Sequence, residues 1–220
     1  MNIQEDKIKE ELSKTVVDTF ENGWHNQRTP YGYLSYDIGD IHIPAQRNPK
    51  IRLDKMREHI NFSGKKVLDF GCNTGGMLHH LDEIFRGVGC DYDARCIDAA
   101  NDINTILGIK KLEFFRHDFD KDSYEDLRKM IDVTLEFKPE IILLLALGSW
   151  VSSWKELYEF SLSYKADIIL EVNNEEEGKP QLEFFKDKGC SIKLVSDAST
   201  DDSTGNLKRR AYLIGNTYGI

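Results

Sequence analysis

The stretch Lys65–Gly76 reads KKVLDFGCNTGG and joins a short apolar run to a turn rich in glycine. Val67, Leu68 and Phe70 predict a buried strand, and a helical pattern follows the turn. Glycines in the turn let the backbone approach a ligand, because they carry no Cβ. Asp69 interrupts the apolar run, where a carboxylate needs a polar partner. The stretch therefore predicts a strand, a tight ligand-binding loop and a helix.

The rest of the chain alternates strand and helix patterns. The expected strands are 66–70, 87–91, 112–117, 141–146, 167–172, 191–195 and 210–215. The expected helices between them are 76–85, 94–107, 123–133, 152–164 and 181–188. Since no helix separates the last two strands, we expect an antiparallel hairpin around the polar segment 196–207. The predicted fold class is α/β, a doubly wound and mostly parallel sheet of seven strands.

An N-terminal extension precedes this alternation. A helix is expected over 4–20, because apolar residues recur there every four positions: Ile8, Leu12, Val16 and Phe20. A loop follows over 21–50, and a short helix over 49–61. The loop is rich in aromatic residues, among them Trp24, Tyr31, Tyr33 and Tyr36. We therefore expect residues 1–62 to form a lid and residues 63–220 to form the ligand-binding domain.

Composition bounds the classes of function. A net charge of −9 disfavours broad, non-specific binding to nucleic acid, which depends on a cationic surface. No apolar run approaches the ~20 residues of a membrane span, and the charged N-terminus has no signal-peptide core, so a cytoplasmic location is expected. The four cysteines lack zinc spacing, and Cys72 and Cys90 are interpreted as buried packing groups at strand ends.

The glycine loop indicates which class of ligand the domain binds. Asp69-x-Gly71-x-Asn73-x-Gly75 resembles motif I of the class I S-adenosylmethionine (SAM) methyltransferases, with asparagine at the middle glycine. The other class of protein with such a loop is the dinucleotide enzymes, whose G-x-G-x-x-G pattern lacks its second glycine here. The closing antiparallel hairpin is also similar to the methyltransferase fold, whereas a dehydrogenase half would continue into a second nucleotide unit.

The resemblance assigns cofactor contacts. Asp91 ends the second strand of the domain, where an acid can accept hydrogen bonds from both ribose hydroxyls, and Asp93 is expected to cap the next helix. The resemblance implies that Asp118 accepts from the adenine amino group. The remaining expected contacts are Gly71, Cys72, Asn73 and Gly75 in the loop, Tyr92 and Phe119 beside the adenine, and Ala146 and Leu147 beneath the methionine portion.

Two arginines precede the loop. Arg52 opens a helix in the sequence Arg-Leu-Asp, which resembles methyltransferases acting on surface-polysaccharide termini and, more loosely, wobble-uridine methyltransferases. That resemblance implies an arginine bound to the SAM carboxylate, with Arg52 as the first candidate and Arg47 as the second. The alternative is a surface arginine on an amphipathic helix.

The expected reaction is methylation of an oxygen on a small polar acceptor, such as a sugar or a nucleotide-linked metabolite. The fourth strand of the domain ends in Leu-Gly-Ser-Trp, without the Asp-Pro-Pro-Tyr motif of amino-group methylation and without a metal-ligand aspartate, so no metal is expected. Glu171, His42 and His25 are the candidate general bases. The alternatives are an RNA methyltransferase, which the acidic charge disfavours, and a catalytically silent SAM- or nucleotide-binding module.

Overall fold

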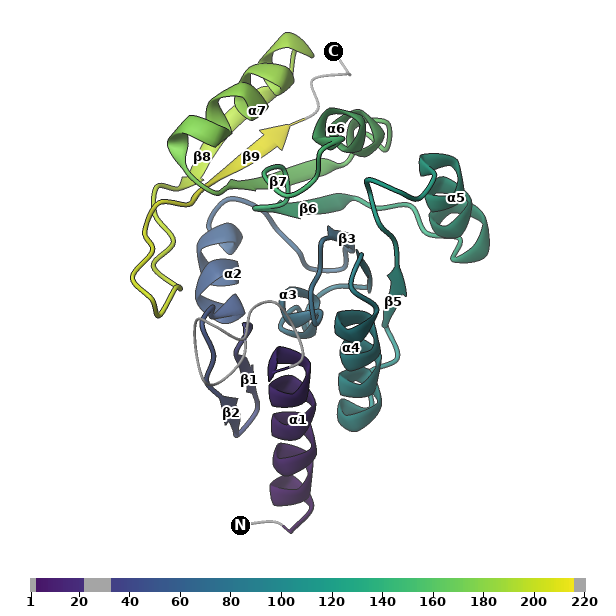
Figure 1. Ribbon diagram of the computed structural model, residues 1–220, viewed down its shortest axis with the longest axis vertical. Coiled ribbons are helices and arrows are strands. Elements are labelled where there is room, and N and C mark those ends of the chain that lie inside the picture. The colour runs from purple at the N-terminus through teal and green to yellow at the C-terminus, as the bar shows by residue number, and fades with distance from the viewer. Residues whose placement is uncertain (1–2, 22–32, 216–220) are drawn as a thin grey trace.

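The computed structural model describes residues 3–21 and 33–215, with side chains for 6–15 and 33–215. Its centre is a seven-stranded sheet in the order β5-β4-β3-β6-β7-β9-β8 (Figure 1). The strands are β3 (Lys66–Phe70), β4 (Arg86–Asp91), β5 (Leu112–Arg116), β6 (Ile141–Leu145), β7 (Asp167–Val172), β8 (Ser191–Ser196) and β9 (Arg210–Gly215). The first five are parallel, and β9 runs antiparallel to both β7 and β8. The predicted sheet and its closing hairpin are confirmed.

The strand order reverses between β3 and β6. From β3 the chain proceeds outward through β4 and β5, and it then returns to the other side of β3 to add β6 and β7. Open α/β sheets bind ligands at such a reversal, in the crevice outside the carboxyl ends of the strands. The topology thus directs attention to the loops that follow β3, β4 and β6.

Helices cover both faces of the sheet (Figure 1). They are α2 (Pro49–Arg57), α3 (Gly76–His79), α4 (Ala94–Leu107), α5 (Tyr124–Arg128), the π-helix η1 (Lys129–Thr134), α6 (Trp154–Leu162) and α7 (Glu175–Asp187). Alternation along β3 shows how the two layers form: Leu68 and Phe70 enter one apolar cluster with α6 and α7, and Val67 enters the other with α2 and α3. Asp69 therefore projects on the α2 side of the sheet.

Several predicted helices have different bounds, among them α2, which ends at Arg57 instead of residue 61. Helix α3 ends at His79 instead of residue 85, because the chain tightens there into bonds from His80 N to Met77 O and from Leu81 N to Leu78 O. The helix expected over 123–133 is α5 continued by η1. Helix α7 begins at Glu175, six residues earlier than expected: Asn174 caps it by accepting from Glu177 N at 2.9 Å, and three glutamates in the first turn suit the helix dipole.

The extension contains more regular structure than expected. Helix α1 (Ile3–Glu21) confirms the predicted helix and packs against α4. The predicted loop contains a hairpin of β1 (Tyr36–Ile38) and β2 (Ile41–Ile43), whose strands are too short for a periodic pattern to reveal. Of the aromatic residues of this loop, Tyr33 and Tyr36 are among the described residues, and Trp24 and Tyr31 lie outside them. Neither α1 nor any other described helix has the length and apolarity needed to cross a bilayer.

Tyr36 ties the hairpin to the glycine loop. Its ring is buried, and its hydroxyl donates to Thr74 O at 2.8 Å. Removing the hydroxyl leaves the Thr74 carbonyl without this donor, so Tyr36→Phe should lower the free energy of unfolding by about 1 kcal/mol. Tyr212→Phe on β9 is the control, since no described residue hydrogen-bonds the Tyr212 hydroxyl. Urea unfolding of both variants measures the difference, and an equal effect would contradict this role for Tyr36.

Candidate active site

A cavity of about 460 Å³ lies at the carboxyl edge of the sheet. Its volume falls within the ~300–1,000 Å³ typical of small-molecule sites. Most of the lining residues come from α2 and from the segments that end or follow β3, β4, β5 and β6, and Tyr33, Leu34 and Arg209 come from elsewhere in the chain. Of the residues expected to contact a cofactor, all except Arg47 and Gly75 line this cavity. Segments far apart in the sequence thus meet where the topology predicts a ligand.

The glycine loop forms the floor beside β3. Gly71 has φ +73°, and a Cβ there would lie 2.8 Å from the Leu147 side chain. Asn73 has φ 52°, a left-handed conformation that asparagine tolerates better than most residues, which explains its place at a glycine position. Gly75 instead faces the core, where a Cβ would lie 2.6 Å from the Phe114 ring. Its role is to let the loop pack, and it does not line the cavity.

Asp91 is held rigidly at the end of β4. Its carboxylate accepts from Asn73 N at 2.9 Å and from Asp93 N at 3.0 Å. Burial raises its pKa, and these backbone bonds oppose the rise. Asp93 caps α4 by accepting from Arg95 N at 3.0 Å, as expected. The adjacent Tyr92 exposes about half of its surface in the cavity, next to the carboxylate expected to hold the ribose.

Asp118 and Phe119 follow β5 and form the next part of the wall. Asp118 accepts from Lys121 Nζ at 2.9 Å and from Asp120 N at 3.1 Å. Burial opposes its ionisation, but the Lys121 bond and the backbone bond lower its pKa below the ordinary value. The Phe119 ring packs edge-on against Phe70, with the ring centroids 5.5 Å apart. An acid that stays ionised therefore lies beside a ring fixed by the core.

Asp69 has an unusual carboxyl group. It is buried, it lines the cavity, and its Oδ2 has no hydrogen-bond partner among the described residues. Burial raises its pKa to about 8, although the charge of Arg52 opposes the rise. A buried polar atom without a partner calls for one. An ammonium group in the cavity would supply both a hydrogen bond and a compensating charge. Asp69 and the neighbouring Arg52 therefore fit the ammonium and carboxylate groups at the amino-acid end of SAM.

Ala146 ends β6 in a strained conformation. Its φ is +59°, which costs a residue with a Cβ about 1–2 kcal/mol. A bond from Ala146 N to Glu171 O at 2.8 Å and a bond from Asn173 Nδ2 to Ala146 O at 3.4 Å hold it there. Strained residues of this kind gather at functional sites. Leu147 and Trp150, which follow Ala146 in the chain, also line the cavity.

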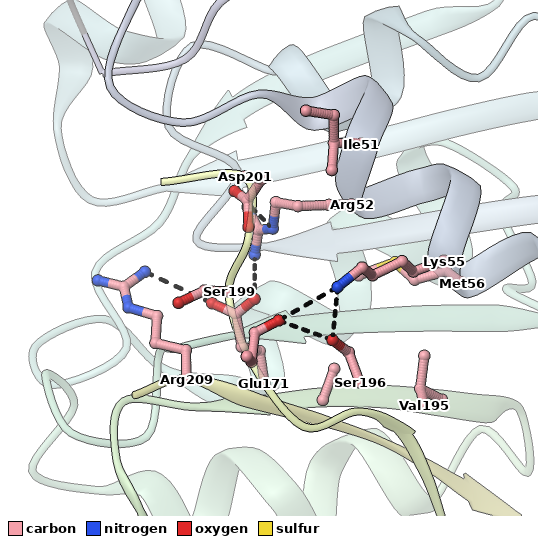
Figure 2. A pocket seen from close by; sticks show the side chains of 12 residues that line it. Ile51, Arg52, Lys55, Met56, Glu171, Val195, Ser196, Ser199, Asp201 and Arg209 are labelled. Carbon is pink, nitrogen blue, oxygen red and sulfur yellow. Dashed lines mark hydrogen bonds and ion pairs between the residues drawn. The ribbon is translucent and has the colours of Figure 1, made fainter. Parts of the chain in front are cut away.

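Glu171 lies beside the cavity and binds three arginines, which we call the Glu171 cluster. Its carboxylate lies 2.9 Å from Arg52 Nη2, 3.4 Å from Arg47 Nη2 and 3.4 Å from Arg209 Nη1. Figure 2 shows Arg52 reaching the carboxylate from α2, and Arg209 reaching it from the other side, at the start of β9. The side chain of Glu171 is only 5% exposed, so water screens these charges little.

The two candidate arginines have different surroundings. Arg52 lines the cavity. Arg47 is completely buried and does not, because Asp201 takes its Nε at 2.6 Å and its Nη2 at 3.1 Å, and Asp202 lies 4.0 Å from the Nε. Arg47 thus joins the segment before α2 to the loop between β8 and β9. Arg52 remains our candidate for a ligand carboxylate, and Arg47 is a structural residue in this site.

The candidate general bases do not converge on the cavity. Glu171 is kept ionised: burial opposes its charge, but Arg52, Arg47 and Arg209 lower its pKa to about 2. A carboxylate of that pKa accepts a proton poorly at neutral pH. His42 is exposed on β2, is paired with Asp37 and does not line the cavity. His25 lies outside the described residues.

About half of the residues that line the cavity were not expected from the sequence. Among them is Arg209, which the sequence places in a run of three cations over 208–210, and Asp201, which binds Arg47, lies in the segment expected to be a polar loop. Tyr33 and Trp150 line the cavity, but neither had been assigned a contact. A signal for Arg209 existed in the predicted hairpin, because an antiparallel last strand begins at the edge where the parallel strands end. Because a long loop precedes this strand, the sequence did not show that Arg209 would pair with Glu171.

Comparisons with known proteins agree with this site. Residues 45–169, more than half of the chain, match the model of a family described as a methyltransferase domain. That region contains the glycine loop, Asp91, Asp118 and the end of β6. A search of curated proteins found no match.

Solved structures share the fold. A SAM-dependent methyltransferase from Aquifex aeolicus is 16% identical, with a TM-score of 0.56 over 77% of this chain and 90% of its own. A magnesium protoporphyrin IX methyltransferase from Synechocystis PCC 6803, solved with bound S-adenosylhomocysteine (SAH), is 15% identical, with a TM-score of 0.53 over 76% and 83%. EvdMO1 is 11% identical, with a TM-score of 0.63 over 96% of this chain, which spans about half (47%) of EvdMO1. At these identities the likeness establishes the fold alone.

The Glu171 cluster predicts an acid-sensitive fold. Since the native pKa of Glu171 is lowered from 4.5 to about 2, its contribution to stability is fully present above pH 4.5 and disappears as the pH falls to 2. Glu171→Gln should lower the free energy of unfolding by about 3 kcal/mol at pH 7, and the difference from wild type should shrink between those two pH values.

Glu175→Gln is the matched control, because it removes an exposed acid that pairs with the neighbouring Arg210. Exposed pairs contribute about 0–1 kcal/mol. Denaturant unfolding at a series of pH values measures both variants. If Glu171→Gln cost no more than Glu175→Gln, the cluster would not stabilise the fold.

Proposed function

Because the chain belongs to the family of methyltransferase domains and is a SAM-dependent methyltransferase, we propose that it methylates an oxygen of a small polar acceptor. One observation carries the proposal: the cavity at the strand reversal is lined both by the fixed acids Asp91 and Asp118 and by an arginine, Arg52. Acids suit the hydroxyl and amino donors of an adenosine, and a guanidinium suits a carboxylate.

The residues present fit SAM. Asp91 would accept from the ribose hydroxyls, and its two backbone bonds already aim the carboxylate. Asp118 would accept from the adenine amino group, with Tyr92 and Phe119 beside the ring. At the other end Arg52 would hold the carboxylate of the cofactor. Asp69 would hold its ammonium group, which satisfies the carboxyl oxygen that has no partner.

The protein mainly aligns the reactants. SAM, when bound, supplies a methyl group activated by its sulfonium, so transfer needs an acceptor oxygen held in line with that group. Leu147 and Trp150 follow the strained Ala146, and the cavity includes all three. Apolar side chains there would help to exclude water from the sulfonium of bound SAM.

Glu171 is better suited to hold Arg52 than to accept a proton. It touches Arg52 at 2.9 Å, and it lines a second, smaller cavity and not the larger one. We therefore replace the expected general base at Glu171 with a positioning role. His42 and His25 stay predictions, since the first lies away from the cavity and the second outside the described residues.

Several observations favour a small acceptor over RNA. The chain carries a net charge of −9, which repels a polyanion. The segment before α2 also narrows the site, because Tyr33 and Leu34 line the cavity. The presence of Tyr33 and Leu34 in the cavity wall supports the proposal that residues 1–62 act as a lid. The extension is also attached to the domain, because Arg47 and Arg52 bind Glu171.

Two experiments test this function. Calorimetry with SAM, SAH and NAD should show binding of the two sulfur compounds and none of NAD. Methyl-labelled SAM incubated with a cell extract should then label the small-molecule fraction and not the RNA. Label in the RNA fraction would favour the RNA alternative, and SAM binding without transfer to either fraction would indicate a silent binding module.

The ribose contact gives a sharp prediction. Asp91→Ala removes a charged acceptor from both hydroxyls, and a hydrogen bond to a charged group is worth ~1.5–3 kcal/mol, so SAH affinity should fall at least tenfold. Asp93→Ala should change it little, because that carboxylate is committed to the α4 cap and to Arg95. Calorimetry measures both affinities. Equal losses would mean that the ribose acid is misassigned.

Asp69 predicts a proton coupled to binding. With a pKa of about 8, the carboxyl group is largely protonated at pH 7 in the ligand-free protein. A cationic ammonium beside it favours the ionised form, so SAM binding at pH 7 should release up to one proton. Calorimetry in buffers of different ionisation enthalpy measures the release, and Asp69→Asn should abolish it. Release that persists in Asp69→Asn would have another source.

A further inference from the structure

A second arginine, Arg209, reaches the cavity from a different part of the chain. Strand β9 pairs antiparallel with β7, with Ala211 opposite Glu171 and Arg210 opposite Val172. Because side chains alternate along a strand, Arg209 projects on the same face as Glu171, and Arg210 projects on the other. Arg210 indeed pairs with Glu175 on α7, at 3.4 Å. The pairing thus brings Arg209, and not its neighbour, to the cavity.

Arg209 is poorly neutralised where it lies. Its side chain is 10% exposed, and its Nη1 lies 3.4 Å from Glu171, a carboxylate that Arg52 already binds at 2.9 Å. The same Nη1 donates to the Tyr33 hydroxyl at 3.3 Å. Its buried Nε has no hydrogen-bond partner among the described residues. Arg209 shares the carboxylate of Glu171 with Arg52 and Arg47, and those two arginines also lie within ion-pair distance of Asp201, which Arg209 does not. Arg209 therefore has the weakest neutralisation of the three, and it keeps a donor unused.

Of Arg52 and Arg209, the proposed function uses only Arg52. A carboxylate pairs with a guanidinium through two parallel hydrogen bonds, so the carboxylate of SAM is accommodated by Arg52 alone. Arg209 lines both the larger cavity and the smaller one, and Figure 2 shows it beside Glu171 in the smaller one. A buried cation with spare donors calls for an anion that the protein itself does not provide.

We propose that Arg209 binds an anionic oxygen group, a carboxylate or a phosphate, on the methyl acceptor. The proposal rests on the proposed function, since it assigns the arginine that the cofactor leaves free. Tyr33 holds the guanidinium in place through its hydroxyl. Trp150, which exposes 60% of its surface, offers the carbon skeleton of the acceptor a broad apolar face in the same cavity. The net charge of −9 favours a small anion over a polyanion.

The test fills the cofactor site first. With the protein saturated by SAH, inorganic phosphate and acetate are titrated separately by calorimetry, so that the two arms distinguish a phosphate site from a carboxylate site. We expect saturable binding of at least one probe, with a dissociation constant on the order of 1 mM. Arg209→Gln should weaken that binding about tenfold or more while changing SAH affinity less than about threefold.

Arg210→Gln is the matched control, because it removes a cation one residue away on the opposite face. It should leave the binding of both SAH and the anion unchanged. If Arg209→Gln does not fold, Arg209→Lys is used instead. Lysine keeps the charge but lacks the planar pair of donors, so it should lower the affinity for the anion.

Three results would overturn the proposal. The first is no saturable binding of either probe to the wild-type SAH complex. The second is anion binding that survives in the Arg209 variant. The third is a loss of SAH affinity in that variant as large as in Arg52→Gln, which would assign Arg209 to the cofactor. Failure of the wild-type protein to bind SAH at all would refute the proposed function, and this proposal with it.

Discussion

The carboxylate of Glu171 is buried at the carboxyl edge of the sheet, within ion-pair distance of Arg47, Arg52 and Arg209. Burying so many charges costs several kcal/mol per ion before their attraction offsets it, so such a cluster is weak evidence for stability alone. Its stronger effect is on geometry. A buried arginine paired with ionised carboxylates can adopt few other positions, and Arg52, which lies 2.9 Å from Glu171 and 3.8 Å from Asp201, lines the cavity.

The same cluster joins segments that are distant in the sequence. The backbone of Arg47 forms isolated β-bridges with Leu34 and Asp202, and its side chain pairs with Glu171. These contacts fix the segment before α2, the loop between β8 and β9 and the end of β7 to one another. Each of them contributes to the cavity or to the wall behind it. A variant of Glu171 should therefore change the affinity for the cofactor, although Glu171 itself does not line the cavity. The Glu171 cluster thus fixes the charged groups beside the crevice that the reversal of strand order creates, where we propose that the cofactor binds.

Patterns in the sequence predicted the sheet and the cofactor loop well, since both depend on local signals. The apolar run with its glycines located β3 and its turn, and the acids at 91 and 118 lie at or just beyond the ends of β4 and β5. The Glu171 cluster depends on pairing over more than 100 residues, as in Arg47 with Asp201, which no local pattern encodes. For the same reason Arg209 resembled a solvated surface cation. The short strands β1 and β2 escaped because three residues cannot show a period.

The central claim is that Glu171 acts on the cofactor through Arg52, and a double-mutant cycle tests it most directly. SAH affinity is measured by calorimetry for the wild type, Arg52→Gln, Glu171→Gln and the double variant, with Arg210→Gln and Glu175→Gln as a control pair on the opposite face. We predict that the double variant binds SAH no more weakly than Arg52→Gln, with a coupling above about 1 kcal/mol, and that the control pair shows none. Losses that add to within about 0.5 kcal/mol would contradict the account, because the two residues would then act independently.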